Sequence, residues 1–423
     1  MYKKYLNCYN VLITGLLTLT LGILTLTLSQ KFIVLIIYLV ASLLMIYAIS
    51  NIIKLITKKD ATHKRNGLVM QLMLNITISS IFFFAPKIPL SLFSLIFGLY
   101  IILNSIIKLV NYIIFKINHI SGRFVELIVF TFYLVFGIFC VSMPSSHLKT
   151  ILFIIGLYFI LLGSTYISDF ITQLIPAKQK NNFKRRFKIT LPIFLSVLIP
   201  HQTLNQISKK GNVDEYVPKK IFKKDDDNKT DLEVLIHVTK KGYGITGHAD
   251  ICFEGKIYSY ANYDHFSYKI FGSIGDGILC IADNKEKYIK FCIKDSKKTI
   301  FVFGIRLTEK QKNEVKAQLN KLKDNTYIWE DAYKNKEYMC HNYYATRLHK
   351  EVKTKFYKFK SGKFKTYFVL SANCVQLVDF ILGVTGSNIL RVNGIITPGA
   401  YYDFLATEYT KKNSNVISYK IYK

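Results

Sequence analysis

The first 208 residues of this 423-residue chain contain almost no acidic side chains. Asp60, Glu126 and Asp169 stand there against 19 lysines and arginines, whereas residues 209–423 carry 24 acidic and 38 basic residues. The whole chain has only 8 prolines and 22 glycines, which excludes collagen-like and low-complexity classes. An apolar content of 51% excludes intrinsic disorder. The formal charge of +30 is therefore shared by two unlike halves, one apolar and one charged.

The apolar half contains six runs that are long enough to cross a bilayer, which needs about 20 mostly apolar helical residues. The runs lie at roughly 11–29, 32–53, 67–86, 88–107, 124–143 and 150–170. Lysines and arginines gather in the loops after the second, fourth and sixth runs, and the other loops are nearly neutral. The positive-inside rule therefore predicts that both ends of this half face the cytoplasm.

Short motifs recur within the apolar half. Residues 50–56 match residues 104–110, and residues 97–101 match residues 155–159 around a shared Gly-Leu-Tyr. Offsets of 54 and 58 residues indicate one helical hairpin used three times. Three such hairpins resemble the HdeD-type acid-resistance membrane proteins over about residues 8–175. That family implies no clear chemistry.

The segment 189–208 decides the compartment of the second half. It is apolar but short, and Pro192 and Pro200 interrupt and end it, which favours an interfacial or re-entrant segment. If it crosses the membrane together with the uncharged residues up to Ser208, the second half lies outside the cell.

The second half alternates strand and helix patterns. Strands are predicted at 234–238, in a hairpin over 247–260, and at about 277–282, 287–293 and 299–306. A capping box at Thr308 starts a helix, a further hairpin turns at Ser361-Gly362, and another helix starts near Cys374. This mixture predicts an α+β domain with an antiparallel sheet. The expected organisation is a six-span membrane domain (1–175), a basic or interfacial segment with a polar linker (176–231), a soluble domain (232–410) and a basic tail (411–423).

The cysteines fit neither a disulfide framework nor a metal site. The second half holds five of them, an odd number without framework spacing. Cys340, His341 and His349 lack the spacing of a tetrahedral zinc site. No metal and no cofactor are expected.

Cys374 has a different setting from the other cysteines. It follows Asn373, which can cap an amphipathic helix that ends near Gly383. Unpaired N–H groups and the dipole at a helix start favour the thiolate form of a cysteine. A nucleophilic cysteine needs a base, and His248, which follows Gly247 at the start of a strand, is the best candidate.

These motifs resemble a known enzyme fold. The resemblance is to the circularly permuted NlpC-type papain fold, over about residues 232–405. It is carried by Gly247-His248 at a strand start, a hairpin ending at Tyr260, and Asn373-Cys374 at a helix start. Lecithin:retinol-acyltransferase-like enzymes share this order. The resemblance implies Cys374 as nucleophile, His248 as base and a third polar residue on the following strand.

The third residue is open, because no histidine stands about twelve residues after His248. Asn262 is the first choice, Tyr260 is the nearby alternative and His265 is a poorer one. A three-residue hairpin turn would place Asn262 opposite His248, whereas a two-residue turn would place Ala261 there.

Four lysines flank the predicted turn before the nucleophile: Lys358, Lys360, Lys363 and Lys365. With a two-residue turn, strand alternation puts all four on one face. Such a face suits anionic lipid headgroups, and it equally suits a solvated edge that blocks aggregation.

The sequence as a whole predicts a six-helix α-helical membrane bundle fused to an α+β permuted papain-like domain with an antiparallel sheet. The expected function is a membrane-anchored cysteine hydrolase or acyltransferase acting on an amide, ester or thioester. The alternative is a non-enzymatic HdeD-like stress or structural membrane protein with a soluble binding domain. The expected partners are the lipid bilayer and anionic headgroups or a membrane-proximal substrate, and no nucleic acid is expected. The N-terminus and the soluble domain are expected in the cytoplasm, and the oligomeric state is not indicated.

Overall fold

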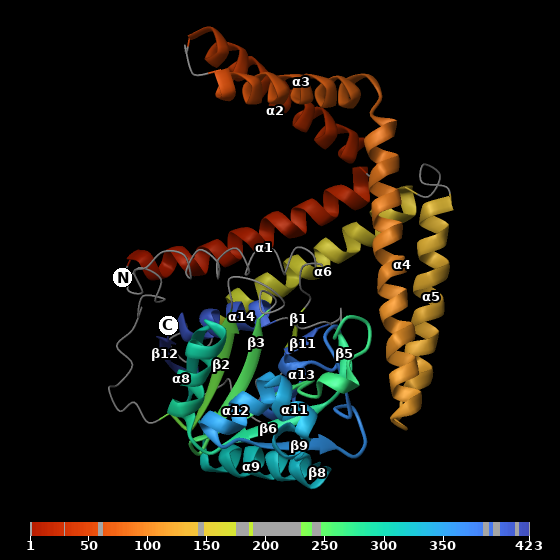
Figure 1. The fold of residues 1–423 in the computed structure, drawn as a ribbon. Helices are drawn as coiled ribbons and strands as arrows, with labels where there is room; N and C mark the ends of the chain where they lie inside the picture. Colours follow the sequence, from red (N-terminus) through yellow and green to blue (C-terminus); the bar gives the residue numbers. More distant parts are fainter. Residues whose placement is uncertain are drawn as a thin grey trace. The chain divides into compact units, whose positions relative to one another are not determined.

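A computed structural model describes residues 2–28, 30–57, 62–142, 148–174, 186–188, 230–238, 247–383, 389–391, 398–410 and 414–422 (Figure 1). The chain forms two compact units. The membrane unit comprises residues 9–112 and 123–169, and the C-terminal unit comprises the remaining segments. The segment 189–208, on which the compartment depends, lies outside the described residues.

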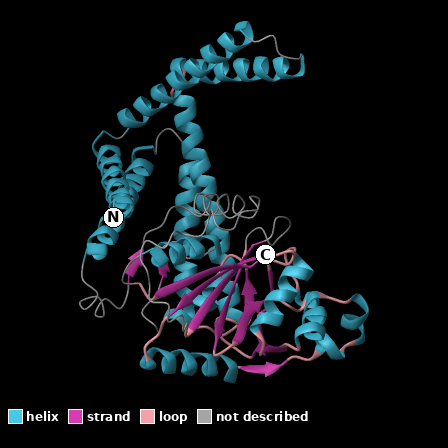
Figure 2. Ribbon diagram, turned by 90° about the vertical axis from the view of Figure 1, so that its left-hand side faces the viewer, coloured by secondary structure: helices cyan, strands magenta, loops and turns pink. Residues whose placement is uncertain are grey.

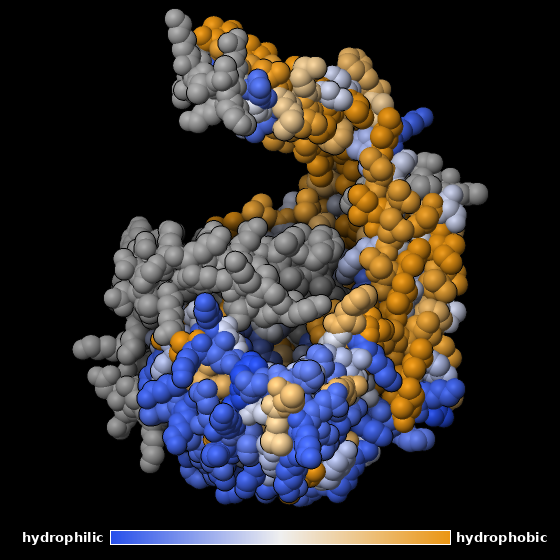
Figure 3. All heavy atoms as spheres, viewed as in Figure 1, coloured by the Kyte–Doolittle hydropathy of each residue, from blue (hydrophilic) through white to orange (hydrophobic). Residues whose placement is uncertain are grey.

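The described residues of the apolar half form the helices α1 (Tyr2–Leu28), α2 (Gln30–Thr57), α3 (Thr62–Phe84), α4 (Lys87–Ile117), α5 (Arg123–Ser142) and α6 (Leu148–Leu174). Four described stretches, within α2, α3, α4 and α5, are long and apolar enough to cross a membrane. The apolar stretches described in α1 and α6, Leu12–Leu28 and Lys149–Ser164, are shorter. Figure 3 shows that α4 and α5 present an apolar surface, as a lipid-facing helix requires.

Small residues let these helices approach each other in pairs. In α1 and α6, a Cβ atom added to Gly22 would lie 2.8 Å from the carbonyl oxygen of Gly156. In α4 and α5, a Cβ atom added to Gly98 would lie 3.0 Å from the carbonyl oxygen of Gly137. Backbones at this distance are typical of helix association in membranes, where small residues give close van der Waals packing.

The pairs follow a cyclic order. The second helix of the first hairpin, α2, packs against α3, where Ser79 donates a 2.9 Å hydrogen bond to the carbonyl of Ala41. The second helix of the next hairpin, α4, contacts α5, where Lys108 and Glu126 form a 3.1 Å ion pair. The last helix, α6, contacts α1 through the glycines described above. Each hairpin repeat therefore packs its second helix on the first helix of the next repeat, and the last repeat returns to the first.

The sequence predicts an antiparallel sheet, and the C-terminal unit is built on one, with eight strands. Figure 2 shows the strands in magenta, and their order is β12-β7-β2-β3-β4-β6-β9-β8. The strands are β2 (Leu232–Val238), β3 (His248–Phe253), β4 (Lys256–Ala261), β6 (Ile278–Ala282), β7 (Thr299–Ile305), β8 (Thr326–Ile328), β9 (Lys355–Phe359) and β12 (Val416–Tyr422). Two short pairs lie outside the sheet: β5 (Ile274–Asp276) with β10 (Thr366–Phe368), and β1 (Arg186–Lys188) with β11 (Ile389–Arg391).

Buried side chains form two apolar clusters, because successive residues of a strand point to opposite faces of the sheet. One cluster joins the sheet to α9 (Glu309–Asp324), α13 (Cys374–Leu382) and α14 (Pro398–Thr410). The other joins it to α8 (Lys285–Ser296), α10 (Asp331–Lys334), α11 (Lys336–His341) and α12 (Tyr344–Val352). Within β2, Val234 and Ile236 belong to the first cluster and Leu235 to the second.

Three local expectations differ from the structure. Residues 287–293 form part of α8 instead of a strand, because the Asn284 side chain caps the helix by accepting the N–H of Lys287. No hairpin turns at Ser361-Gly362, since β9 pairs with β6 and β8 while β10 pairs with β5. Residues 416–422, expected in a basic tail, form strand β12 beside β7. The capping box at Thr308 is confirmed, and α9 follows it.

Candidate active site

Cys374 is the first residue of α13, as the sequence predicts. The side-chain oxygen of Asn373 accepts the N–H of Gln376 at 3.0 Å, and its amide donates to the carbonyl of Val369 at 2.9 Å. The cap therefore fixes both the helix start and the chain that leads into it. Helix α13 packs against β3 and β4. Cys374 is only 3% exposed, and Tyr367 is among the groups that interact with it.

His248 is the first residue of β3, and its ring lies close enough to Cys374 for the two groups to interact electrostatically. Its Nε2 atom lies 2.8 Å from Oδ1 of Asp250 and 2.9 Å from the hydroxyl of Ser259. Nδ1 is the ring nitrogen that carries neither of these two contacts. The preceding Gly247 has a φ of +82°, which favours glycine, and a Cβ there would lie 3.1 Å from the carbonyl oxygen of His237. The structure thus brings together the two residues that the sequence singled out.

Asp250 completes a chain of polar contacts that the sequence analysis missed. It lies two residues after His248 on β3, so both side chains leave the same face of the strand. Its carboxylate is fully buried, with Oδ2 placed 2.8 Å from Nε2 of His237 and accepting the Tyr288 hydroxyl at 2.8 Å. His237 lies directly opposite His248 in the register of β2 and β3. A His-x-Asp spacing on a strand was the signal that could have identified Asp250.

Burial and mutual electrostatic interactions together set the protonation states of His248, Asp250 and His237. Burial alone would lower the pKa of His248, but the Asp250 carboxylate and the Cys374 sulfur raise it to about 10. Burial would raise the pKa of Asp250, yet the two histidines hold it well below its usual range. Burial lowers the pKa of His237 to about 4, against the pull of Asp250. The arrangement favours a protonated His248 beside an ionised Asp250, and a neutral His237.

The expected third residues lie elsewhere. Asn262 donates through its side-chain amide to the carbonyl of Gly272 at 2.7 Å, which braces a loop. Tyr260 is buried, and its hydroxyl donates to the carbonyl of Phe364 at 3.0 Å. The ring of His265 stacks on Tyr343 with centroids 4.5 Å apart. The hairpin has the two-residue turn, with Phe253 opposite Lys256, so continued pairing sets Ala261 opposite His248.

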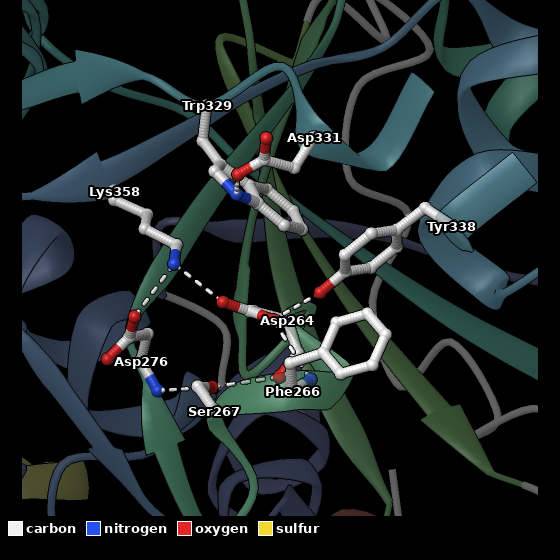
Figure 4. Close-up of polar contacts among 8 residues, drawn as sticks. All are labelled: Asp264, Phe266, Ser267, Asp276, Trp329, Asp331, Tyr338 and Lys358. Atoms are coloured by element: carbon white, nitrogen blue, oxygen red, sulfur yellow. Dashed lines mark hydrogen bonds and ion pairs between the residues drawn. The ribbon is translucent and has the colours of Figure 1, made fainter. Parts of the chain in front are cut away.

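The four lysines do not share one face. Figure 4 shows Lys358 directed inward, where its Nζ atom lies 2.6 Å from Asp264 and 2.8 Å from Asp276. Lys360 is exposed, and Lys363 is exposed while donating to the Gln376 side chain at 2.6 Å. Lys365 is half-buried. The alternation that would align these residues requires the hairpin that the structure lacks.

Comparison with known proteins finds a match in the first half of the chain. Residues 13–78, 73–142 and 131–180 each match a family described as a short repeat of unknown function, DUF308. Residues 13–180 are therefore similar to three such repeats in tandem. Such repeats occur in the HdeD-like family, and together with the apolar helices they make the chain a multi-pass membrane protein with a soluble sheet domain. No curated protein and no solved structure matches the chain.

Proposed function

We propose that the soluble domain is a papain-like cysteine hydrolase or acyltransferase that six membrane spans hold at the bilayer. The observation that carries this proposal is the position of His248 between Cys374 and Asp250. The cysteine at the helix start matches the role of nucleophile. The histidine on the neighbouring strand matches the role of base, and the carboxylate beside the imidazole matches the role of orienting group. The order of histidine before cysteine suits the permuted, NlpC-like variant of this fold.

In the proposed reaction, His248 already holds the proton of the Cys374 thiol when the substrate binds. The sulfur attacks the carbonyl carbon of an amide, ester or thioester, and the leaving group departs with the proton from His248. Water or an acceptor then gives up a proton to His248 and attacks the acyl-cysteine, which restores the thiolate. Asp250 keeps the imidazole oriented and stabilises its protonated form.

The negative oxygen that forms on the carbonyl needs donors in place before the reaction. The first N–H groups of a helix lack partners within the helix, so the N–H of Cys374 at the start of α13 is available for this role. The hydroxyl of Tyr367, which neighbours the cysteine, is a second donor for this role.

The membrane half supplies attachment in this proposal. Four described stretches meet the length and composition of a span, and the third DUF308 repeat includes α6. We therefore assign all six helices as spans, with the basic loops and the soluble domain in the cytoplasm. The exposed Lys360 and Lys363 are the lysines left available for anionic headgroups.

The second candidate function is a soluble binding domain without catalysis. The observation that favours it is the burial of Cys374, since a purely structural cysteine is among the most buried residue types.

Thiol alkylation of the full chain in nanodiscs separates the two candidates. Iodoacetamide modification of each cysteine is followed by mass spectrometry between pH 5 and 9, in the wild-type protein and in His248→Ala. We expect Cys374 to react at pH 6 at least about ten times faster in the wild type than in the variant, because the protonated histidine stabilises the thiolate. Cys340, which is exposed, serves as the reference thiol. If Cys374 follows the pH profile of Cys340 and ignores the His248 substitution, the catalytic proposal fails.

A further inference from the structure

A loop between Asp264 and Asp276 carries apolar side chains out into solvent. We call residues 265–275 the apolar loop. Phe271 at its tip is 93% exposed and Ile270 is 62% exposed, and Phe266 and Tyr268 are also exposed. Neighbouring apolar side chains on a soluble domain are costly to leave in water, and such a patch marks an interaction site.

The backbone of the tip holds these side chains outward at a cost. Ile270 and Phe271 have φ values of 49° and 53°, followed by Gly272 at 78°. The left-handed region suits glycine, but for a β-branched or bulky residue it is an outlier. A strained conformation of this kind persists only where the surrounding structure imposes it, and it clusters at functional positions.

Hydrogen bonds inside the loop satisfy part of its polar backbone. The N–H of Lys269 donates to the carbonyl of Ile274 at 2.8 Å, and the N–H of Ile274 donates back at 3.2 Å. The N–H and the hydroxyl of Ser273 both donate to the carbonyl of Ile270, at 3.1 Å and 2.7 Å. Backbone groups that enter the hydrocarbon need such internal partners, whereas groups at headgroup depth can bind water or lipid phosphate.

The charge of the apolar loop suits an anionic lipid surface. Residues 265–275 include Lys269 and no aspartate or glutamate. The two acidic residues that flank the loop, Asp264 and Asp276, both form ion pairs with Lys358 (Figure 4). Lys358 therefore closes the base of the loop, and together with Lys269 it balances the two negative charges that would repel phospholipid headgroups.

We propose that the apolar loop docks on the bilayer, with Ile270 and Phe271 inserted among the lipid headgroups and upper acyl chains. The occupant is the membrane that the chain's own apolar helices cross, so it is always within reach of the soluble domain. Aromatic side chains are favoured at this interface. The proposal does not depend on catalysis by Cys374.

Docking would also orient the candidate active site. Strand β5 closes the apolar loop and pairs with β10, and the N–H of Val369 donates to the carbonyl of Ser273 at 3.0 Å. Cys374 follows Val369 by five residues. A docked loop would therefore hold the start of α13 close to the membrane surface.

Tryptophan fluorescence of the full chain in vesicles tests the proposal. The single native tryptophan, Trp329, is buried and present in every variant, so it gives a constant background. Phe271→Trp adds a second tryptophan at the tip, and Tyr327→Trp adds one at an exposed position on β8 as the matched control. Vesicles contain phosphatidylcholine and phosphatidylglycerol at a ratio of about seven to three, with or without phosphatidylcholine brominated near the headgroup.

We expect the emission added by Phe271→Trp to be blue-shifted and quenched at least about twofold by the brominated lipid, and that of Tyr327→Trp to be unaffected. Adding Lys269→Glu to Phe271→Trp should weaken the quenching. Emission at the wavelength of an exposed tryptophan, without quenching, would overturn the proposal. A blue shift without bromolipid quenching would also overturn it, since it would place the tip against protein, for example a second copy of the chain.

Discussion

The proposed chemistry should be sensitive to substitution of Asp250, because its carboxylate both lies against the His248 ring and stabilises the positive charge of that ring. In Asp250→Asn the neutral amide no longer favours the imidazolium, so the pKa of His248 should fall toward its usual range. We expect the low-pH limb of Cys374 alkylation to move to higher pH and the rate at pH 6 to fall by about 10²-fold. The measurement is the pH profile of iodoacetamide labelling.

Asn262→Ala provides the matched control for that experiment. Its amide braces the loop at Gly272 and does not meet His248 in the structure, so the alkylation profile of Cys374 should be unchanged. A profile shifted by Asn262→Ala and not by Asp250→Asn would return Asn262 to the third position and remove Asp250 from it.

Two histidines give the stability of the soluble domain opposite dependences on pH. The pKa of His248 is raised from 6.5 to about 10 in the folded state, so its contribution is complete below pH 6.5 and is lost as pH rises toward 10. The pKa of His237 is lowered to about 4, so its contribution is complete above pH 6.5 and is lost as pH falls toward 4. Asp250, whose pKa is well below 3.8, adds a loss at still lower pH.

Urea unfolding followed by Trp329 emission should therefore show a maximum of stability near pH 6.5. His248→Gln should flatten the alkaline limb while leaving the acid limb in place. If the alkaline limb is the same in the variant, the raised pKa of His248 is not its cause.

At the scale of single residues, local signals were sufficient where the chemistry is local. Asn373 before Cys374 predicted the helix start correctly, because a capping side chain acts within three residues. The partner of His248 depended instead on strand register and burial, which decide whether Asp250, Ser259 or Asn262 reaches the ring. Lys358 was assigned to a surface for the same reason, since its partners Asp264 and Asp276 lie more than 80 residues earlier.

At the scale of elements, periodicity separated the helical half from the mixed half and predicted the antiparallel sheet. It was wrong for α8, where Tyr288, Ile289, Phe291 and Cys292 are all buried and read equally as a buried strand. The capping Asn284 was the decisive local signal there. The pairing of α6 with α1 lay beyond any pattern along the chain, because it joins the two ends of the repeat array.

Close packing of that helix pair leads to a prediction. In Gly22→Leu the new Cβ would lie 2.8 Å from the backbone oxygen of Gly156 and 2.8 Å from the backbone nitrogen of Ile160, which cannot yield as a flexible side chain could. We expect a loss of about 2 kcal/mol of stability in detergent from overpacking. Gly67→Leu is the control, since no atom lies within 4 Å of a Cβ there, and its effect should stay within about 0.5 kcal/mol. Equal losses in both variants would show that α1 does not depend on its contact with α6.

At the scale of the whole molecule, the charge of +30 has two sources. Part of it lies in the basic loops between the apolar helices, and part lies in the soluble domain. Within that domain, Lys358 is paired with Asp264 and Asp276 at the base of the apolar loop. An anionic membrane is a suitable partner for Lys269 on the apolar loop and for the exposed Lys360 and Lys363. Charge of this kind indicates how the protein is oriented at a membrane better than it indicates a nucleic-acid partner.

The orientation itself is testable with the native cysteines. A maleimide is bulkier than iodoacetamide and suits Cys340, the exposed cysteine among the described residues, better than the buried Cys374. If the soluble domain is cytoplasmic, a membrane-impermeant maleimide should leave Cys340 unlabelled on intact cells and label it after permeabilisation. Cys340→Ser identifies the labelled site. Labelling of Cys340 on intact cells would place the domain outside and make the segment 189–208 a seventh crossing, and the proposed reaction would then be directed at extracellular amides or esters.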